Sequence, residues 1–485
     1  MLDKRALSRQ YIDGVWCEGR SETVYSDVNP YSQESIAQIR FASVADIDDA
    51  YHAALRSQPN WGKTSAYERS ALLQRVAGLL EQKRQDIVQL IVEELGGTQV
   101  KAHVEIDIAL GMLRAASDLP LRMEGSIRPS MIPGKENRIY RLPIGVVGVI
   151  SPFNFPLALS IRSVAPAIAA GNAVVLKPDP QTFLTGGSLV AQLFEQAGLP
   201  AGVLNMVVPD IAEVGDAFVE HPIPRLISFT GSTAVGRRIG EICGRHLKRV
   251  ALELGGNNVM IVLADADVEQ AVRAAIFGKF MHQGQICMCL NRILVHRNVY
   301  DSFVEKFVAH ASQLKAGDPA DPSVTIGPLI NRRQAEKVAR LIEAGEREGA
   351  RVVLRGTIEG CLVRPFVLAD VRNDMEIAQH EVFGPVASII PFDDEEEAIR
   401  VANESEHGLS GSVFSRDLEH GVDVALRIQT GMVHVNDQSI NDEPNVAFGG
   451  EKASGLGRFG AEWSLEEFTT VRWVSVQRQP RVYPF

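Results

Sequence analysis

Features that mark secreted proteins are scarce in this sequence. Its five cysteines are scattered over positions 17, 243, 287, 289 and 361, an odd number that does not suit a disulfide framework. Such usage suits a reducing compartment, and we expect a cytoplasmic protein. The N-terminus mixes both charges and leads into no apolar stretch of the kind that a secretory signal requires. We therefore predict no export.

Long runs of one charge and long apolar runs are also missing. The net charge is −11 and no long Lys/Arg run occurs, so we expect neither nucleic acid nor an anionic membrane surface as a partner. The stretch 143–161 carries no charged side chain, but Pro152, Asn154 and Pro156 interrupt it. Its first part, 144–150, is short and continuously apolar, as expected of a strand buried in a parallel sheet rather than of a membrane span.

A chain of 485 residues exceeds the usual size of a single core, so two or three domains are expected. Strand-like and helix-like segments alternate from residue 144 onward, with helical patterns at 184–196 and 234–243 that we expect to stop at Gly198 and Gly244. This alternation predicts a doubly wound α/β domain, and a second α/β domain after Gly255. The β-rich segments are 144–150, 173–176, 203–208, 226–229 and 250–254, then 259–262, 292–295, 388–391, 411–414 and 432–435.

Three other segments follow different patterns. Residues 45–57 and 67–95 have the periodicity of amphipathic helices, which we expect to cover the first sheet. Residues 125–142 alternate polar and apolar side chains around Pro133-Gly134, a pattern that predicts a β-hairpin.

The residues that point most directly to chemistry are a thiol and a carboxylate. Cys287 follows a polar, Gly-containing stretch that begins at His282, and Glu253 lies thirty-four residues earlier. A buried, inert cysteine is the commoner case, but the preceding residues predict an exposed loop after a helical pattern that ends near 278–282. Cys289 is the weaker candidate thiol. A metal site built from His282, Cys287 and Cys289 fails on spacing, since no second Cys pair accompanies them.

Three other segments suit a cofactor and an oxyanion. The Gly-x-Gly-x-x-Gly motif of ordinary Rossmann dehydrogenases does not follow the first strand, but residues 229–236, Phe-Thr-Gly-Ser-Thr-Ala-Val-Gly, form a Gly-containing strand-to-helix turn whose amides could hold a pyrophosphate. A tight βα turn without a ligand is an equal alternative. Lys177 ends another candidate strand and suits a ribose or phosphate contact, or is simply a solvated lysine. Prolines around Asn154 restrict its loop, as an oxyanion donor requires.

Six of these elements, in this order along the whole chain, resemble motifs of the aldehyde dehydrogenase superfamily. They are Pro-Phe-Asn-Phe-Pro at 152–156, Lys-Pro at 177–178, Phe-Thr-Gly-Ser at 229–232, Glu-Leu-Gly-Gly-Asn at 253–257, Gly-Gln-Ile-Cys at 284–287 and Glu-Val-Phe-Gly-Pro at 381–385. The resemblance implies an aldehyde dehydrogenase-like α/β fold, with a Rossmann-type cofactor domain at 1–124 and 143–254 and an α/β catalytic domain at 255–467. A small β bridging element at 125–142 and 468–485 would join subunits into a homodimer or homotetramer.

Residue roles follow from the same resemblance. It implies that Cys287 is the nucleophile, that Asn154 and the Cys287 amide form the oxyanion hole, and that Glu253 is the base that activates water. The implied cofactor is NAD, with NADP possible, bound by Ser151, Pro152, Phe153, Lys177, Gly231, Ser232, Leu254, Glu381 and Phe383. The expected substrate pocket contains Leu159, Arg162, Ile286 and Met288; Arg162 is as readily an ordinary salt-bridged arginine. No resident metal is expected.

The chain departs from the family pattern in places that bear on selectivity. Phe153 replaces the usual Trp and Asn257 the usual Lys, while Pro180 stands where NAD-preferring members often have a Glu that binds the ribose 2′-hydroxyl. The segments 161–166, 177–180, 253–258, 434–438 and 483–485 are similar to benzaldehyde and related aryl-aldehyde dehydrogenases, so an aromatic aldehyde substrate is expected. Alternatives are a CoA-acylating enzyme, which would not need Glu253, a broad-specificity aliphatic aldehyde dehydrogenase, and a catalytically silent protein, which the presence of Cys287 opposes.

Overall fold

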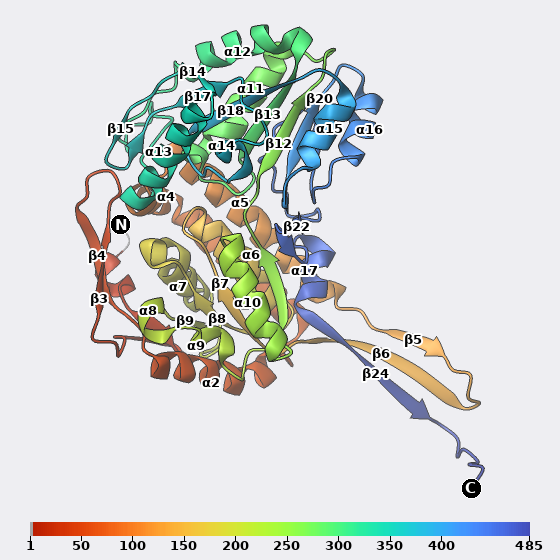
Figure 1. Ribbon diagram of the computed structural model, residues 1–485. Coiled ribbons are helices and arrows are strands. Elements are labelled where there is room, and N and C mark those ends of the chain that lie inside the picture. The colour runs from red at the N-terminus through yellow and green to blue at the C-terminus, as the bar shows by residue number, and fades with distance from the viewer. Residues whose placement is uncertain (1–2) are drawn as a thin grey trace.

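The computed structural model describes residues 3–485 and contains two large β-sheets, each covered by helices (Figure 1). The first sheet has eight strands in the order β2-β1-β9-β8-β7-β10-β11-β23. Its five central strands are parallel, and the order places a topological switch point between β7 and β10, where a ligand crevice is expected. The strands are β1 (Gln10–Ile12), β2 (Val15–Cys17), β7 (Val146–Ile150), β8 (Ala173–Lys177), β9 (Leu204–Met206), β10 (Leu226–Thr230), β11 (Arg249–Glu253) and β23 (Gly455–Leu456).

The second sheet has seven strands in the order β14-β17-β18-β13-β12-β20-β21, and all but the edge strand β14 pair in parallel. Together the two sheets confirm the predicted α/β fold. The strands are β12 (Asn258–Val262), β13 (Leu290–His296), β14 (Arg351–Leu354), β17 (Phe366–Ala369), β18 (Val386–Phe392), β20 (Gly411–Phe414) and β21 (His434–Val435).

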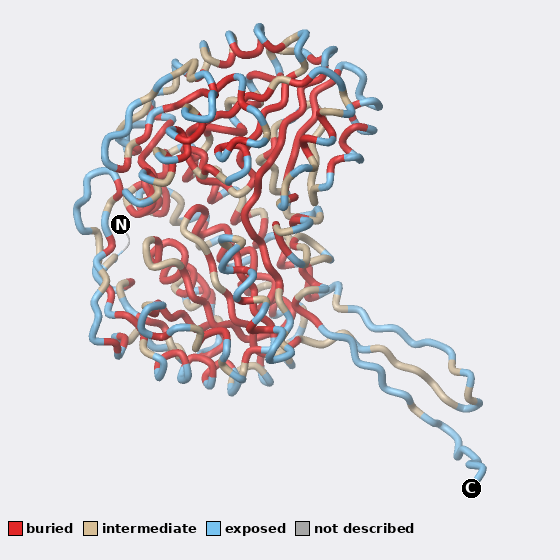
Figure 2. Tube along the Cα trace, in the orientation of Figure 1, coloured by how far each residue is buried: buried red, intermediate tan, exposed pale blue. Residues whose placement is uncertain are grey.

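Both faces of the first sheet are packed. Successive β7 residues point to opposite faces, so Val146 joins one core cluster and Val147 the other. Helices α2 (Val44–Trp61) and α10 (Thr233–Arg245) supply the Val146 side, while α3 (Ala66–Gln82), α4 (Arg84–Leu95), α5 (Gln99–Asp118), α6 (Pro156–Ala169) and α7 (Leu189–Gln196) supply the other. Every residue of α6 is buried, so this helix forms the centre of the larger cluster (Figure 2).

The second sheet is covered in the same way. Helices α11 (Val268–Phe280) and α12 (Arg297–Ala311) pack on one face through residues such as Phe303 and Phe307. Helices α13 (Arg332–Arg347), α15 (Glu395–Asn403) and α16 (Leu418–Leu426) pack on the other.

A three-stranded arm projects from this body. Strands β5 (Ser126–Pro129) and β6 (Lys135–Pro143) form the predicted hairpin, and β24 (Thr469–Gln477) pairs antiparallel with the whole of β6. The arm extends away from both sheets and is largely exposed (Figures 1 and 2). Its exposed side chains include Ile127, Met131 and Trp473.

Helix boundaries account for three corrections to the sequence predictions. The segment 67–95 is two helices, because Lys83 leaves the helical conformation at φ −97°, ψ 8° and divides α3 from α4. Helix α10 does not stop at Gly244, since Leu247 takes the left-handed conformation (φ 52°) beyond its end. The helix expected at 184–196 begins as a π-helical turn, Leu184–Ser188, whereas its end before Gly198 (φ 87°) is confirmed.

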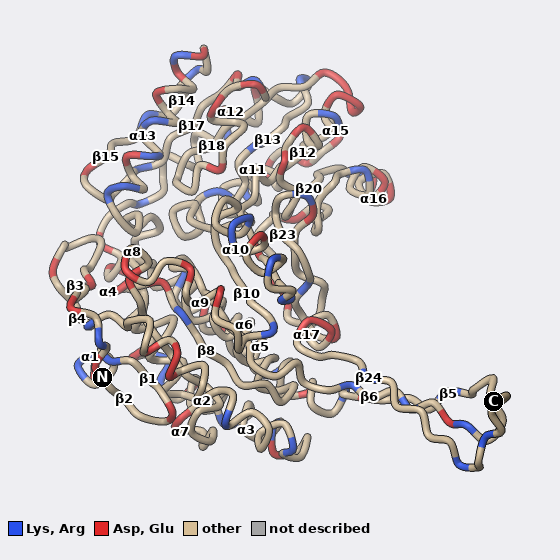
Figure 3. The backbone as a smooth tube through the Cα atoms, turned by 60° about the horizontal axis from the view of Figure 1, so that its bottom comes forward, with Lys and Arg blue, Asp and Glu red and all other residues tan. Residues whose placement is uncertain are grey.

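Basic and acidic residues are interspersed along the chain (Figure 3). Within residues 3–485, none of the helices has the length and apolar character needed to cross a membrane.

Candidate active site

The chain reaches Cys287 through a sharply bent segment after α11. His282, Gln283 and Gly284 have φ values of 50°, 55° and 75°, three left-handed residues in succession. Only glycine fits the third position, because a Cβ atom there would lie 2.3 Å from the carbonyl oxygen of Gly384. The Cys289 amide then donates to the Ile286 carbonyl at 2.9 Å, which closes a turn with Cys287 near its centre.

The expectation that this segment is an exposed loop is wrong. His282, Gln283 and Gln285 are buried, and only Cys287 is partly exposed. The polar side chains form internal hydrogen bonds: Gln283 Nε2 donates to the Pro328 carbonyl at 2.9 Å, and Gln285 Oε1 accepts from the Ile330 amide at 3.0 Å. Polar composition here reflects an internal clamp rather than contact with solvent.

Asn258, the first residue of β12, holds residues 286–289, which we call the thiol turn. Its Nδ2 donates to the carbonyl oxygens of Cys287 (2.7 Å) and Cys289 (2.8 Å), while its Oδ1 accepts from the Ser410 amide at 2.9 Å. Sequence reasoning did not assign this role to Asn258. The only signal for it was an asparagine placed after the Gly-Gly pair of the Glu253 motif.

Asn154 contacts the start of the same turn. It follows β7, is buried, and donates from Nδ2 to the Gln285 carbonyl at 3.0 Å. The helix that begins just after it is anchored by Glu105: its Oε1 accepts from the Leu157 amide at 2.8 Å, and its Oε2 forms a buried ion pair with Lys101. The Asn154 amide is therefore held by buried contacts before any substrate arrives.

Glu253, the last residue of β11, is buried, and neither carboxylate oxygen has a hydrogen-bond partner among the described residues. The nearest cation is Arg162, whose Nη1 lies 3.7 Å from Glu253 Oε2. Burial raises the pKa of Glu253 to about 8, partly offset by Arg162. Burial, followed by the Glu253 carboxylate, raises the pKa of the Cys287 thiol well above its ordinary value.

An apolar cavity opens on one side of Cys287. All four residues predicted for a substrate pocket line it, namely Leu159, Arg162, Ile286 and Met288. Sequence reasoning missed the remaining wall, because most of it comes from helices α5 and α11 and from a loop distant in sequence. These residues are Val104, Ile108, Phe155, Ala158, Phe277, Met281, Ile440 and Asp442, and Asn154 and Cys287 also face the cavity.

A second cleft opens on the other side, at the carboxyl ends of β7, β10 and β11. It shares Asn154, Leu159 and Cys287 with the apolar cavity. Ser151 and Lys177 are buried at the ends of β7 and β8 and lie outside its lining. Seven residues predicted to bind a cofactor line it, Pro152, Phe153, Gly231, Ser232, Leu254, Glu381 and Phe383, as do Thr230, Glu253, Gly255, Gln334 and Lys337.

The second cleft has the features of a dinucleotide site. Ser232 caps α10, lines the cleft and makes no side-chain hydrogen bond at that cap, so its hydroxyl is available to a ligand at the helix N-terminus. A Cβ atom on Gly255 would lie 2.9 Å from Glu381 Oε2, so a glycine keeps this approach open. Burial raises the pKa of Glu381 to about 7, while the Gly256 amide and Lys337 oppose the rise.

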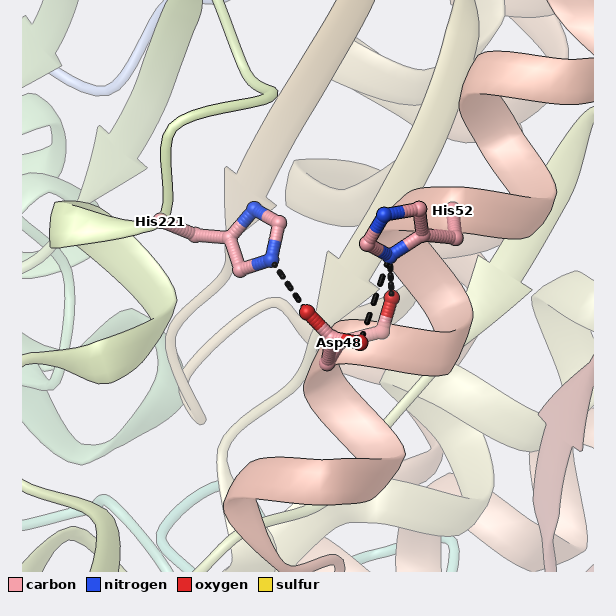
Figure 4. Close-up of side chains that lie close together, drawn as sticks. All are labelled: Asp48, His52 and His221. Carbon is pink, nitrogen blue, oxygen red and sulfur yellow. Dashed lines mark hydrogen bonds and ion pairs between the residues drawn. The ribbon is translucent and has the colours of Figure 1, made fainter.

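Asp48, His52 and His221 form a separate cluster of side chains that could ligate a metal (Figure 4). Their contacts are those of hydrogen bonds. His221 Nδ1 accepts from the Ile223 amide at 3.3 Å, which leaves the proton on Nε2, 3.1 Å from Asp48 Oδ1. His52 Nδ1 lies 3.0 Å from the Asp48 carbonyl oxygen and must carry a proton to bond it. Because a ligating nitrogen has to be unprotonated, this arrangement does not suit coordination.

A Rossmann-type sheet has a cleft at its switch point, and Cys287 lines both this cleft and an apolar cavity, an arrangement typical of a nucleotide-dependent enzyme. The sequence profile of the "Aldehyde dehydrogenase family" matches residues 16–474, and the chain belongs to this family.

Similar proteins cover essentially the whole chain. It is 53% identical to benzaldehyde dehydrogenase YfmT of Bacillus subtilis over 100% of both chains. It is 51% identical to vanillin dehydrogenase of Corynebacterium glutamicum, with 97% of this chain and 98% of that one covered. The crystal structure of an NAD-dependent benzaldehyde dehydrogenase from Corynebacterium glutamicum superposes with a TM-score of 0.91 at 47% identity, covering 98% of this chain and 100% of that one.

Replacing Asn258 with Ala should destabilise the thiol turn. The change leaves two buried carbonyls and one buried amide without their partner, and we expect a loss of about 3 kcal/mol in the free energy of unfolding. Urea denaturation followed by fluorescence measures it. Asn445→Ala, at an exposed asparagine, is the matched control and should leave the transition in place. Equal urea midpoints for the two variants would contradict this stabilising role of Asn258.

Proposed function

We propose that this enzyme oxidises aromatic aldehydes to carboxylic acids with NAD, through a thioester on Cys287. The observation that carries the proposal is the meeting of the apolar cavity and the cofactor cleft at Cys287 and Asn154. A flat, apolar ring suits the first space, and its aldehyde carbon would then lie against the thiol. The names of the similar proteins, benzaldehyde and vanillin dehydrogenases, support an aryl aldehyde.

In the first step the Cys287 thiolate attacks the aldehyde carbon, forms a carbon–sulfur bond, and pushes the carbonyl electron pair onto oxygen. Asn154 Nδ2 and the Cys287 amide are the donors that we assign to this oxygen. Asn154 already points to the thiol turn, since it donates to the Gln285 carbonyl. Burial raises the pKa of the thiol, so the thiol must first lose its proton to water in the shared cleft, and Glu253 is kept for the later hydrolytic step.

The second cleft fits NAD, which supplies the electron acceptor for this oxidation when bound. We assign the pyrophosphate to Gly231 and Ser232 at the start of α10, and the rest of the cofactor to the walls formed by Phe153, Leu254, Glu381 and Phe383. Pro152 also lines this cleft, and Ser151 and Lys177, at the ends of β7 and β8, would add contacts to the cofactor. Pro180 offers no carboxylate to repel a 2′-phosphate, so NADP should also be used.

In the last step water hydrolyses the thioester. The Glu253 carboxylate takes one proton from water, the hydroxyl adds to the acyl carbon, and the carbon–sulfur bond breaks to release the acid and the thiolate. A carboxyl group with a pKa near 8 is a strong base in its ionised form, and its two unpartnered oxygens within the described structure are available to water. A CoA-acylating enzyme would have no use for this group, which favours hydrolysis.

We also propose that the chain divides into the domains expected from the family resemblance: cofactor-binding at 1–124 and 143–254, catalytic at 255–467, and bridging at 125–142 and 468–485. The two sheets and the arm support this division. Strand β23 crosses it, since it pairs with β11 at the edge of the first sheet.

A substrate panel tests the proposed reaction. We expect kcat/KM for benzaldehyde and hydroxylated benzaldehydes to exceed that for acetaldehyde by roughly two orders of magnitude, because a small aldehyde leaves most of the apolar cavity unfilled. Reduction of NAD without CoA is the readout, repeated with NADP to measure coenzyme preference. Comparable efficiency for acetaldehyde and benzaldehyde would refute the aromatic assignment, and a requirement for CoA would refute hydrolysis.

Glu253→Gln should separate oxidation from hydrolysis. The variant should release about one equivalent of NADH per active subunit and then turn over slowly, because the thioester accumulates. Mass spectrometry of the stalled protein should find the acyl group on Cys287. Cys289→Ala is the matched control: its thiol donates to the Lys279 carbonyl at 3.1 Å, so both burst and turnover should persist. Unchanged turnover in Glu253→Gln would exclude Glu253 as the base.

The exposed arm supports the proposal of a homodimer or homotetramer. Ile127 and Trp473 are 70% and 63% exposed, as apolar side chains on a projecting sheet would be before a partner covers them. Trp473→Asp should lower the mass measured by sedimentation, whereas Leu426→Asp, at an 80% exposed site on α16, should not. A monomeric wild-type protein at micromolar concentration would contradict the proposal.

A further inference from the structure

The buried Arg162 guanidinium lies between the buried Glu253 carboxylate and the partly buried Asp442 carboxylate, beside the thiol. Arg162 Nη2 forms a close ion pair with Asp442 Oδ2, and Arg162 Nη1 lies 3.7 Å from Glu253 Oε2. The exposed fractions of the three side chains are 4%, 9% and 1% in the order Arg162, Asp442, Glu253. At 3.7 Å the second contact is too long for a hydrogen bond, so Arg162 is committed to Asp442 and only near Glu253.

The position of Arg162 is held by its surroundings. It lies on the buried helix α6, and its guanidinium carbon lies 3.9 Å from the centre of the Phe448 ring. Its Nη1 is a buried donor without a hydrogen-bond partner anywhere in residues 3–485. An unpaired donor of this kind gains free energy if it can reach an acceptor, and after Asp442 the nearest anion is the Glu253 carboxylate, 3.7 Å from Nη1. Another contact must therefore keep the Arg162 guanidinium away from the Glu253 carboxylate.

Asp442 is in a position to do this. Its loop is fastened to the thiol turn, because Ser439 Oγ donates to the Met288 carbonyl at 2.6 Å, and Ser410 Oγ donates to the Ser439 carbonyl at 2.7 Å. The Asp442 carboxylate thus approaches Arg162 from a part of the chain that is rigidly tied to Cys287.

We propose that Asp442 is a positioning residue for hydrolysis: it holds the Arg162 guanidinium away from Glu253, so that the Glu253 carboxylate stays unpaired and free to take a proton from water. This inference rests on the proposed role of Glu253. Without Asp442, Arg162 closes the gap and forms a direct ion pair with Glu253. A carboxylate in such a pair binds a proton less readily and is a weaker base.

The charges around Glu253 agree with this arrangement. Arg162 and Arg458 lower the pKa of Glu253, whereas Asp442 raises it, as does burial, the largest cause. Arg458 is occupied by the carbonyls of Gly450 and Gly457, each at 2.9 Å, and by Glu451. The Cys287 thiol, which Glu381 also faces, completes the set of titratable groups. Arg162 is thus the cation that Asp442 can redirect.

The pH dependence of deacylation tests the proposal. An activated ester, p-nitrophenyl benzoate, acylates the thiol without NAD; the burst of nitrophenolate reports acylation and the steady phase reports hydrolysis. In the wild type, hydrolysis should rise with pH around a midpoint near 8, because only ionised Glu253 accepts a proton. Asp442→Ala should lower this midpoint by about one unit and Asp442→Asn by less, since Asn still accepts from Arg162. The high-pH rate should fall several-fold in Asp442→Ala.

Two further variants should move the pH midpoint of hydrolysis in the opposite direction or not at all. Arg162→Met should raise the midpoint, and in that background Asp442→Ala should move it much less, because Asp442 acts through Arg162. Glu443→Gln, which removes a charge at the exposed neighbouring residue, is the matched control and should leave the midpoint unchanged.

The two proposals fail in different ways. A wild-type protein without a burst would refute the Cys287 thioester itself. A normal burst with an unmoved or raised midpoint in both Asp442 variants would overturn the role of Asp442. If Arg162→Met does not fold, the nearly isosteric Asp442→Asn variant still decides the matter.

Discussion

The structure depends on one constraint: a reactive thiol must stand at a fixed point between two spaces. Three left-handed residues redirect the chain after α11. Asn258 then donates hydrogen bonds to the carbonyl oxygens of Cys287 and Cys289. The turn is fastened from three directions, by β12 through Asn258, by the Asn154 loop through Gln285, and by the Asp442 loop through Ser439. Pre-organisation of this kind lets catalytic donors act without reorganising during the reaction.

Burial makes the Glu253 carboxylate a stronger base, and it also makes the Cys287 thiol harder to ionise. The same low-polarity surroundings raise the pKa values of Glu253 and Cys287, and the negative charge of one opposes that of the other. A single guanidinium moderates both, since Arg162 lowers each pKa. Full pairing of Arg162 with Glu253 would relieve the unfavourable burial but would weaken the base. The shared ion pair with Asp442 is a compromise between stability and reactivity.

Much of this could be predicted from the sequence, where a local pattern decides the outcome. Short apolar runs located five strands of each sheet but missed β1, β2 and β23 of the first and β14 and β17 of the second. The motif residues Cys287, Asn154 and Glu253 converge on one cleft. What failed depended on tertiary contacts. The helix break at Lys83 interrupts a continuous apolar periodicity, and Gln283 and Gln285 before Cys287 bond backbone groups of Pro328 and Ile330 inside the core. Val104 and Ile108 reach the apolar cavity only because α5 packs on α6, a contact that no spacing encodes.

The chain path explains why the reactive groups meet where they do. Strand β11 ends at Glu253 and β12 begins at Asn258, so residues 254–257 carry the chain from the carboxyl edge of the first sheet to the amino edge of the second. The carboxyl edge of the first sheet supplies the cleft residues after β7, β10 and β11, as expected at a switch point. The amino edge of the second sheet supports the thiol, because Cys287 lies three residues before Leu290, the first residue of β13, which is the neighbour of β12. Glu253 thus lies at the carboxyl edge of one sheet and Cys287 near the amino edge of the other, and residues 254–257 join the two sheets. Backbone pairing of β11 fixes the position of Glu253, whereas side-chain hydrogen bonds from Asn258, Asn154 and Ser439 fix the turn that carries Cys287.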